Sequence, residues 1–226
     1  YRVYADGEEV GGACLANGVF PRVEWGINLR IIDTRSEFLQ LHAASMSHGG
    51  RGFIFAGDSG CGKSTLAAIL LSRGWQYLCD EFALVDARSV RLRPFPKALC
   101  IKEGSQAVVR RLGLRFARRR DYVKAFKGRV GYIDPRSVGT GGVGGPVPAR
   151  VIVFPKYAHA SHARFEPISR AHAAMALYRG EGPEAPPVAA TTTLLPAASP
   201  GGIAGGEVGG ETQPEGSRGR IHLEGK

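Results

Sequence analysis

Residues 57–64 read Gly57-Asp58-Ser59-Gly60-Cys61-Gly62-Lys63-Ser64, which fits the pattern G-x-x-x-x-G-K-[ST]. An apolar tetrapeptide, Phe53 to Ala56, precedes this stretch, and the apolar segment Lys63 to Ser72 follows it. These flanks are typical of a strand and of a buried helix. Glycines let such a loop approach phosphate oxygens closely, while its N–H groups and the helix N-terminus supply positive partial charge. The stretch therefore predicts a strand–loop–helix unit that binds nucleotide phosphates.

The pattern assigns a task to individual residues of this loop. Lys63 is expected to reach the β- and γ-phosphates, and the Ser64 hydroxyl to ligate Mg²⁺. The alternative is a glycine-rich turn that matches by accident, with odds on the order of one in a hundred before the flanks are considered. Cys61 occupies a free position, as a small filler residue or as an oxidation-sensitive thiol. The predicted nucleotide-binding residues are Gly57, Asp58, Ser59, Gly60, Cys61, Gly62, Lys63, Ser64 and Thr65.

An acidic pair, Asp80-Glu81, follows Ser64 by sixteen residues and comes directly after the apolar residues Tyr77 to Cys79. Carboxylates at the end of an apolar strand are costly to bury unless they meet a cation. Magnesium bound beside the nucleotide phosphates would be such a cation. A surface hairpin that carries two ordinary carboxylates is the alternative.

The rest of the chain alternates between strand-like and helix-like segments, which favours an α/β sandwich. We expect one domain at 1–179, with its strand–loop–helix–strand core at about 37–102. The segment 180–226 has no aromatic residue and 17 Gly or Pro among its 47 positions, so we expect a disordered tail. Apolar spacing predicts a helix from about Pro21 with a stripe of Phe20, Val23, Ile27 and Ile31, and a last helix at 169–178 with a stripe of Ala174, Met175 and Tyr178. A short basic helix is expected at 106–114. Strands are expected at 38–44, 53–56, 77–85, 90–92 and 151–154.

The positive charge of the chain is confined to one region. Residues 88–129 contain fourteen Lys or Arg and two acids, a net +12, whereas the whole chain of 226 residues carries +10. A solvated basic face is one interpretation; docking of an acidic protein or peptide substrate, or help with nucleotide charge, is another. Nucleic acid is a weaker candidate, because Phe116 and Tyr122 are the only aromatic residues close to the basic cluster.

Cysteine usage and hydropathy exclude several classes of protein. The four cysteines form no C-x-x-C pair, so neither a zinc ribbon nor a dense disulfide framework is indicated, and reduced thiols in a cytoplasm are expected. The longest apolar run, Leu66 to Leu71, is too short to span a bilayer, and no export signal is recognisable. The sequence gives no indication of the oligomeric state.

Several residues together resemble the HPr kinase/phosphorylase family. The run G-D-S-G-x-G-K-S at 57–64 is followed by Ala67, Leu71, Arg73-Gly74 and Asp80-Glu81, and His42 precedes Gly57 by fifteen residues. The group of HPr-kinase-related proteins is the closer match, through Trp75, Asp80-Glu81-Phe82-Ala83 and Arg93-Pro94-Phe95-Pro96. The likeness covers about residues 37–102, and more loosely Glu24 to Pro155.

This resemblance implies an ATP-dependent protein serine kinase on a P-loop fold related to phosphoenolpyruvate carboxykinase. By position, Asp80 would accept the proton of the attacking hydroxyl, His42 would sit against Asp80, and Ser64 with Glu81 would hold Mg²⁺. On its own, His42 could equally be a core histidine. Glu81 replaces the second Asp of the family, Thr65 replaces a Glu, and the L-E-[VI]-R-G-x-G signature is missing. Recognition of HPr itself and the reverse phosphorolysis therefore do not follow.

Taken together, the sequence predicts a cytoplasmic enzyme that uses ATP and Mg²⁺ to phosphorylate a hydroxyl group. A Ser of a protein or peptide is the expected acceptor. A small-molecule kinase of the same fold is the first alternative. A nucleotide-dependent regulatory or binding protein with little turnover is the second.

Overall fold

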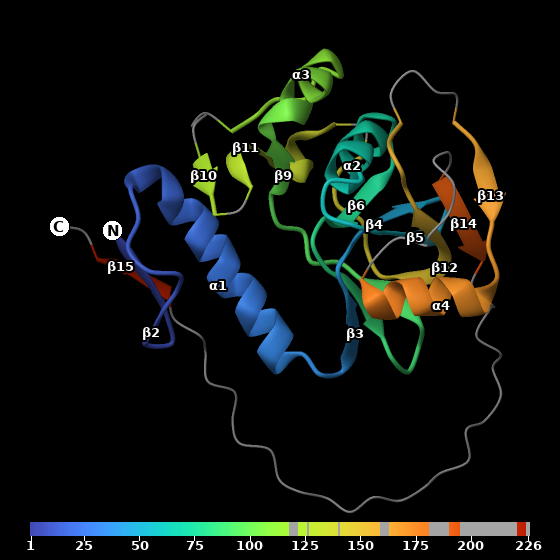
Figure 1. Cartoon of the computed structure of the whole chain (residues 1–226), viewed down its shortest axis with the longest axis horizontal. Coiled ribbons are helices and arrows are strands. Elements are labelled where there is room, and N and C mark those ends of the chain that lie inside the picture. Colours follow the sequence, from blue (N-terminus) through green and yellow to red (C-terminus); the bar gives the residue numbers. More distant parts are fainter. Residues whose placement is uncertain are drawn as a thin grey trace, which may run out of the picture.

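The computed structural model describes residues 1–117, 122–125, 127–139, 141–158, 163–180, 190–194 and 221–224. They form a mixed α/β fold around a central mixed sheet, as the alternation of segments predicts (Figure 1). No helix in these described ranges is long and apolar enough to cross a membrane.

The central sheet runs in the order β3-β7-β8-β12-β5-β4-β6, with β14 paired to β12 and β13 paired to β14. The interior strand β5 pairs in parallel with β12 and antiparallel with β4. The strands are β3 (Phe38–Leu41), β4 (Ala43–His48), β5 (Arg51–Ala56), β6 (Gln76–Cys79), β7 (Ala83–Asp86), β8 (Arg91–Arg93), β12 (Val147–Phe154), β13 (Phe165–Pro167) and β14 (Ala190–Leu194).

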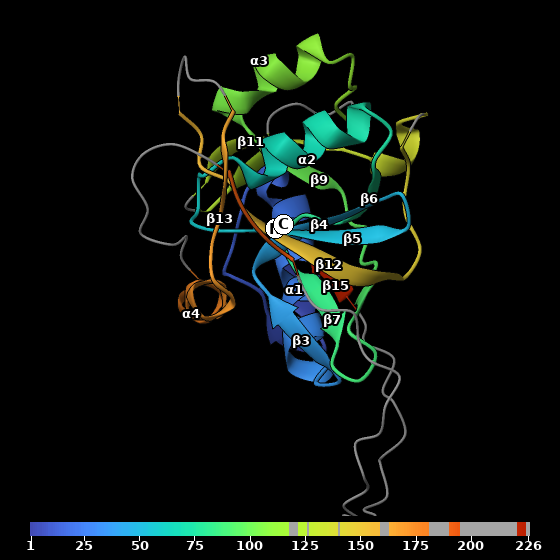
Figure 2. The ribbon, with the colours of Figure 1, turned by 90° about the vertical axis from the view of Figure 1, so that its right-hand side faces the viewer.

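Helices cover both faces of this sheet (Figure 2). Helix α2 (Lys63–Ser72) packs Ala67 and Leu71 against one face, where Phe55 lies buried. Helix α4 (Arg170–Arg179) packs Ala173 and Ala176 against the other face, which contains Ile54. Successive residues of β5 thus face opposite helices, as the period of two in a strand requires.

Two smaller sheets and the remaining helices flank this centre. Strands β9 (Leu99–Lys102), β10 (Tyr122–Lys124) and β11 (Gly128–Ile133) form one sheet in the order β10-β11-β9. Strands β1 (Arg2–Ala5), β2 (Glu8–Glu9) and β15 (Ile221–Glu224) form the other. The remaining helices are α1 (Val19–Thr34), α3 (Glu103–Arg111) and two short 3-10 helices, η1 (Ala16–Gly18) and η2 (Pro135–Ser137).

Two segments that the sequence predicts as single strands are each broken in two. The predicted strand at 38–44 becomes β3 and β4, with a bend at His42. The predicted strand at 77–85 becomes β6 and β7, and its break falls at Asp80 to Phe82. In both places the chain leaves one part of the central sheet and enters another, because β3 and β7 pair with each other while β4 pairs with β6. Because the apolar composition continues from the first strand into the second, the sequence does not reveal where one ends and the other begins.

Two helices form where predicted, but only one of the two predicted stripes packs inward. In α1, Val23 packs against a small apolar cluster and the Phe20 ring lies 4.7 Å from that of Tyr132, although Phe20 remains 40% exposed. The same helix also buries Glu24, which joins an internal ion-pair cluster. In α4, capped by Ser169 as expected, the predicted stripe was wrong: Tyr178 is 89% exposed, and small residues pack against the sheet.

The predicted tail, 180–226, lies for the most part outside the described residues. Gly180 closes α4 with a left-handed backbone, and the two strands β14 and β15 pair with β12 and β1. Disorder of the rest of 180–226 stays a prediction.

Candidate active site

The strand order brings three chain segments to one edge of the central sheet. Strand β6 is antiparallel to β4, and β4 is antiparallel to β5, so β5 and β6 run in the same direction. Their carboxyl ends therefore meet at the same edge, where β4 begins with Ala43 opposite Ala56. The glycine loop after β5, the acidic pair after β6 and His42 before β4 are thus placed together. Ligands in open α/β sheets commonly bind at such an edge.

The glycine loop joins β5 directly to α2. Gly57, Gly60 and Gly62 have φ angles of +135°, +97° and +101°, a region that L side chains rarely adopt. A Cβ added at Gly60 would meet nothing within 4 Å, so its need for glycine comes from the backbone and not from crowding. Gly62 is also the N-cap of α2 and supplies no side-chain cap. The first N–H groups of that helix therefore face the loop.

Lys63 lies buried within the curve of this loop. Its ammonium donates hydrogen bonds to the carbonyl oxygens of Gly57 at 2.5 Å and Asp58 at 2.9 Å. The Cys61 sulfur is 3.9 Å from the same nitrogen. Two carbonyl oxygens of the loop thus hold the Lys63 ammonium inside it.

Asp80 is buried at the carboxyl end of β6, with 8% of its surface exposed. Ser64, the second residue of α2, donates its hydroxyl to Asp80 Oδ1 at 3.1 Å, and the backbone N–H of Cys100 donates to Oδ2 at 3.0 Å. Burial raises the pKa of the Asp80 carboxyl, and the Lys97 ammonium and these hydrogen bonds lower it by less. A carboxylate poised for protonation therefore lies beside the predicted magnesium ligand.

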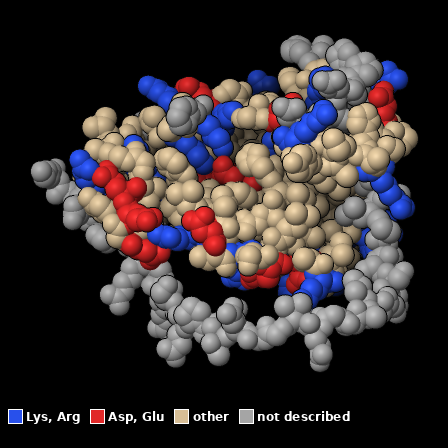
Figure 3. All heavy atoms as spheres, turned by 60° about the horizontal axis from the view of Figure 1, so that its bottom comes forward, with Lys and Arg blue, Asp and Glu red and all other residues tan. Residues whose placement is uncertain are grey.

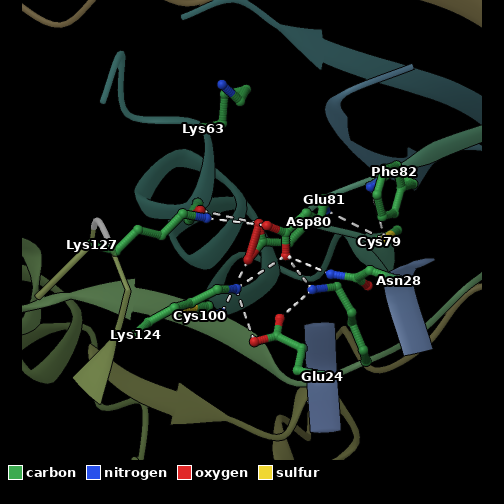
Figure 4. A network of polar contacts seen from close by, with 12 residues as sticks. Glu24, Asn28, Lys63, Cys79, Asp80, Glu81, Phe82, Cys100, Lys124 and Lys127 are labelled. Atoms are coloured by element: carbon green, nitrogen blue, oxygen red, sulfur yellow. Dashed lines mark hydrogen bonds and ion pairs between the residues drawn. The ribbon is translucent and has the colours of Figure 1, made fainter. Parts of the chain in front are cut away.

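Glu81 has a different set of partners, although it is the next residue. Ion pairs join it to Lys97, to Lys124 at 3.5 Å and to Lys127 at 3.1 Å (Figure 4). Burial by itself would raise the pKa of Glu81, but the three ammonium groups outweigh it and hold that pKa well below its ordinary value. Glu81 is therefore ionised, and its carboxylate is bound by three lysine ammonium groups.

A second carboxylate, Glu24 of α1, completes this cluster from the far side. It is 5% exposed, pairs with Lys97 and with Lys124 at 2.9 Å, and accepts a hydrogen bond from the Tyr132 hydroxyl at 2.8 Å. Sequence reasoning missed this cluster, because its members come from α1, the segment before β9 and the β10–β11 hairpin. The available signal was Glu24, which the helix spacing places on the inward face of α1.

His42 lines the same cavity as Asp80, and no hydrogen bond joins the two in the described part of the chain. Its ring lies edge-on to that of Phe82, with centroids 6.5 Å apart. Partial burial, with the charge of Lys63, lowers the pKa of His42, so the imidazole is neutral at pH 7. The place of His42 against Asp80 stays a prediction.

The cavity is open to solvent and offers about 90 Å³ to the centres of water molecules. Residues of the glycine loop, the acidic pair and three lysines line it together. They are His42, Ser59, Gly60, Gly62, Lys63, Ser64, Thr65, Asp80, Glu81, Cys100, Lys102, Ser105 and Lys127. Thr65 turns its hydroxyl to Ser105 of α3, at 2.9 Å.

The predicted magnesium ligands fit unequally. The Ser64 hydroxyl and the Asp80 carboxylate are adjacent oxygen donors, which suits a small hard cation that also takes phosphate oxygens and water. Glu81, the other predicted ligand, is bound to three ammonium groups instead. No group of three or more His, Cys, Asp or Glu that could hold a metal ion occurs among the described residues.

The basic stretch 88–129 does not form one continuous face. Arg91 and Arg93 belong to β8, and Arg110 lies on α3; Figure 2 shows α3 and β7, the neighbour of β8, at opposite ends of the molecule. Lys97 and Lys124 are turned inward to Glu24. Arg118 to Arg120 lie outside the described residues. Viewed from another side, basic and acidic side chains are interspersed around a broad uncharged area (Figure 3).

Comparison with known proteins gives a distant structural likeness. No protein family model and no curated protein sequence matches the chain. Among solved structures, the chain is similar to the Hpr(Ser) kinase/phosphatase from Coxiella burnetii, with 15% sequence identity and a TM-score of 0.31 over 59% of this chain and 67% of that one. Such a likeness is too remote to support a function, which has to be judged from the site itself.

Proposed function

We propose that the chain is an ATP-dependent kinase that transfers the γ-phosphoryl group to a hydroxyl, with a Ser of a protein or peptide as the expected acceptor. The observation that supports this proposal is the 3.1 Å hydrogen bond between Ser64 and Asp80 at the foot of the glycine loop. It brings a phosphate-binding helix start and a buried carboxylate into one cavity. Phosphoryl transfer asks a protein mainly for positioning, for charge stabilisation and for one base.

In this proposal the glycine loop binds the phosphates of the nucleotide. Lys63 keeps its ammonium inside the loop by bonding to the carbonyls of Gly57 and Asp58. Phosphate oxygens, which are stronger acceptors for an ammonium than neutral carbonyls, would take over these bonds. The uncapped N–H groups at the start of α2 would donate to the same phosphates.

In this proposal Asp80 binds the hydroxyl of the acceptor and takes its proton. A carboxylate offers about four lone-pair sites, so the hydrogen bonds from Ser64 and Cys100 leave room for a hydroxyl donor. The raised pKa of Asp80 makes it a stronger base than an ordinary aspartate at neutral pH, because proton-transfer efficiency follows the basicity of the acceptor. Asp80 would take the hydroxyl proton as the oxygen attacks phosphorus.

Magnesium would be held by the Ser64 hydroxyl together with the nucleotide phosphates. When bound there, the ion neutralises charge on the β- and γ-phosphate oxygens. Glu81 stays with its lysines and keeps their ammonium groups close to the cavity. His42, neutral and at the wall, would limit the entry of water without taking a proton itself.

Incubation with γ-labelled ATP, Mg²⁺ and a cell extract from the source tests the proposal. We expect the wild-type chain to label a macromolecular band, and Lys63→Ala to abolish labelling and weaken ATP binding, because the ammonium inside the loop is lost. Arg51→Gln, which removes an exposed charge at the opposite end of β5, is the matched control. Unchanged ATP affinity of Lys63→Ala would refute the nucleotide site. Binding without any transfer would favour a regulatory protein.

A further inference from the structure

The ion-pair cluster around Glu24 and Glu81 holds one positive charge more than it has carboxylates. Lys97 and Lys124 each pair with both glutamates, so two lysines already balance two acids. Lys127 pairs with Glu81 alone. Its side chain is 30% exposed, against 11% for Lys97 and 13% for Lys124. Lys127 is therefore the surplus charge of the cluster, and the one nearest to solvent.

This surplus charge faces the candidate active site. Lys127 lies in the turn between β10 and β11 and lines the same cavity as Lys63 and Asp80. In Figure 4 its side chain extends from that turn toward the acidic pair, whereas Lys63 belongs to the glycine loop. Lys102, at the end of β9, also lines the cavity and pairs with no carboxylate among the described residues. Two cations in addition to the loop lysine thus border the space beside Asp80.

The negative charge of a nucleotide held by the glycine loop would be neutralised mainly by Lys63, by helix N–H groups and by magnesium. Lys127 and Lys102 would then not be needed to bind the nucleotide. Positive charge that lines a cavity raises the local concentration of anions and favours an anionic ligand. Because Lys127 lines the same cavity as Asp80, an anion bound by Lys127 would lie close to the proposed base. The second substrate is the molecule that has to occupy this place.

We infer that Lys127, assisted by Lys102, binds an anionic group that the acceptor carries close to its reacting hydroxyl. This inference rests on the proposed kinase function and specifies its acceptor. The shared chemistry is a carboxylate or a phosphate ester within reach of a hydroxyl. An acidic residue beside a Ser in a peptide would supply it, and so would a small phosphorylated alcohol. Lys127 acts here as a residue that determines specificity, and Asp80 remains the base.

Binding to the protein loaded with Mg²⁺ and β,γ-imido-ATP, which cannot transfer its terminal group, tests this site. Two matched pairs of probes distinguish the sources: glycerol phosphate against glycerol, and a Ser peptide flanked by Glu against the same peptide flanked by Gln. We expect at least one anionic probe to bind about tenfold more tightly than its neutral partner, the size of one charge-assisted contact. Lys127→Gln should remove that preference, and Lys127→Arg and Arg51→Gln should keep it.

Three results would overturn the inference. The first is that neither pair of probes shows a preference for the anion, and the second is that the preference survives in Lys127→Gln. The third is that Lys127→Gln weakens the binding of β,γ-imido-ATP itself, which would make Lys127 part of the nucleotide site. Failure of the kinase proposal gives a different result, because the analogue then does not bind the wild type at all. In that case the same probes, titrated into Lys63→Ala without nucleotide, decide whether Lys127 binds anions.

Discussion

Asp80 and Glu81 are neighbours in the chain, yet they lie in opposite electrostatic surroundings. Asp80 accepts hydrogen bonds from a hydroxyl and a backbone N–H, and burial raises its pKa. Glu81 meets three ammonium groups, and its pKa is lowered. One carboxylate is kept ready to take up a proton, and the other is kept charged. The comparison teaches that an acidic pair in a sequence need not act as a pair, because adjacent side chains at a strand end point to different neighbours.

Asp80→Asn should produce the largest effect. Asparagine keeps the shape and can still accept the Cys100 N–H, but it cannot take a proton from a hydroxyl. We expect phosphoryl transfer to fall by about 10²–10⁴-fold, the usual contribution of a general base, with ATP affinity retained. Rates of ADP release and titration with ATP measure the two quantities. Undiminished transfer by this variant would remove Asp80 from its proposed role.

Glu81→Gln should act on stability instead. It leaves Lys97 and Lys124 with the single carboxylate of Glu24 and takes away the carboxylate that Lys127 pairs with, and breaking buried ion pairs in this way costs about 3–5 kcal/mol. Urea denaturation measures the loss. Glu37→Gln, which removes an exposed carboxylate 2.6 Å from Arg35, is the matched control and should change little. Equal, small changes in both variants would contradict a stabilising role for the ion pairs of Glu24 and Glu81.

The pH dependence of stability should separate the two acids by sign. The folded-state pKa of Asp80 is raised, so its neutral form favours the folded state and stability declines as pH rises through that raised pKa. The folded-state pKa of Glu81 is lowered, so its contribution is present above the unfolded value of about 4.5 and is lost as pH falls below it. Urea midpoints at a series of pH values should therefore decline on both sides of a mildly acidic optimum.

The two variants assign these declines. Asp80→Asn should flatten the decline on the alkaline side, and Glu81→Gln should flatten the decline on the acid side. A single variant that removed both declines would show that the two carboxylates titrate as one unit, which would erase the contrast between them.

Local sequence signals predicted the strand–loop–helix unit and much of the sheet. Helix α2 spans Lys63–Ser72 as predicted, because glycines mark both of its ends and its interior is almost wholly apolar. The start of β12 was placed four residues too late, because Pro148 interrupts the strand signal, and the start of α3 three residues too late, because Glu103, Gly104 and Ser105 give no apolar period. The extent of an element could thus be predicted only where its composition changes sharply.

The arrangement of the candidate site was harder to predict, because it depends on contacts between distant segments. The sequence placed Lys63, Ser64 and Asp80 in one site, since their spacing belongs to one recognisable pattern. It could not show that Glu81 forms ion pairs with Lys124 and Lys127, because the β10–β11 hairpin brings these lysines to it. The apolar stripe on α4 misled for the same reason: burial follows the neighbouring surface, and a helix sequence does not contain that surface.

The parallel pairing of β5 with β12 has a consequence for how the molecule is assembled. Gly52 pairs with Ala149, so the chain must close a very long loop before the middle of the central sheet is complete. During synthesis, β4, β5 and α2 emerge well before β12. Until β12 arrives, β5 is an open edge that presents Phe53, Ile54 and Phe55, a sequence suited to pairing with other chains. The glycine loop can thus form early from local residues, while the strand that supports it depends on a late, slow step during which the nascent chain is exposed to aggregation.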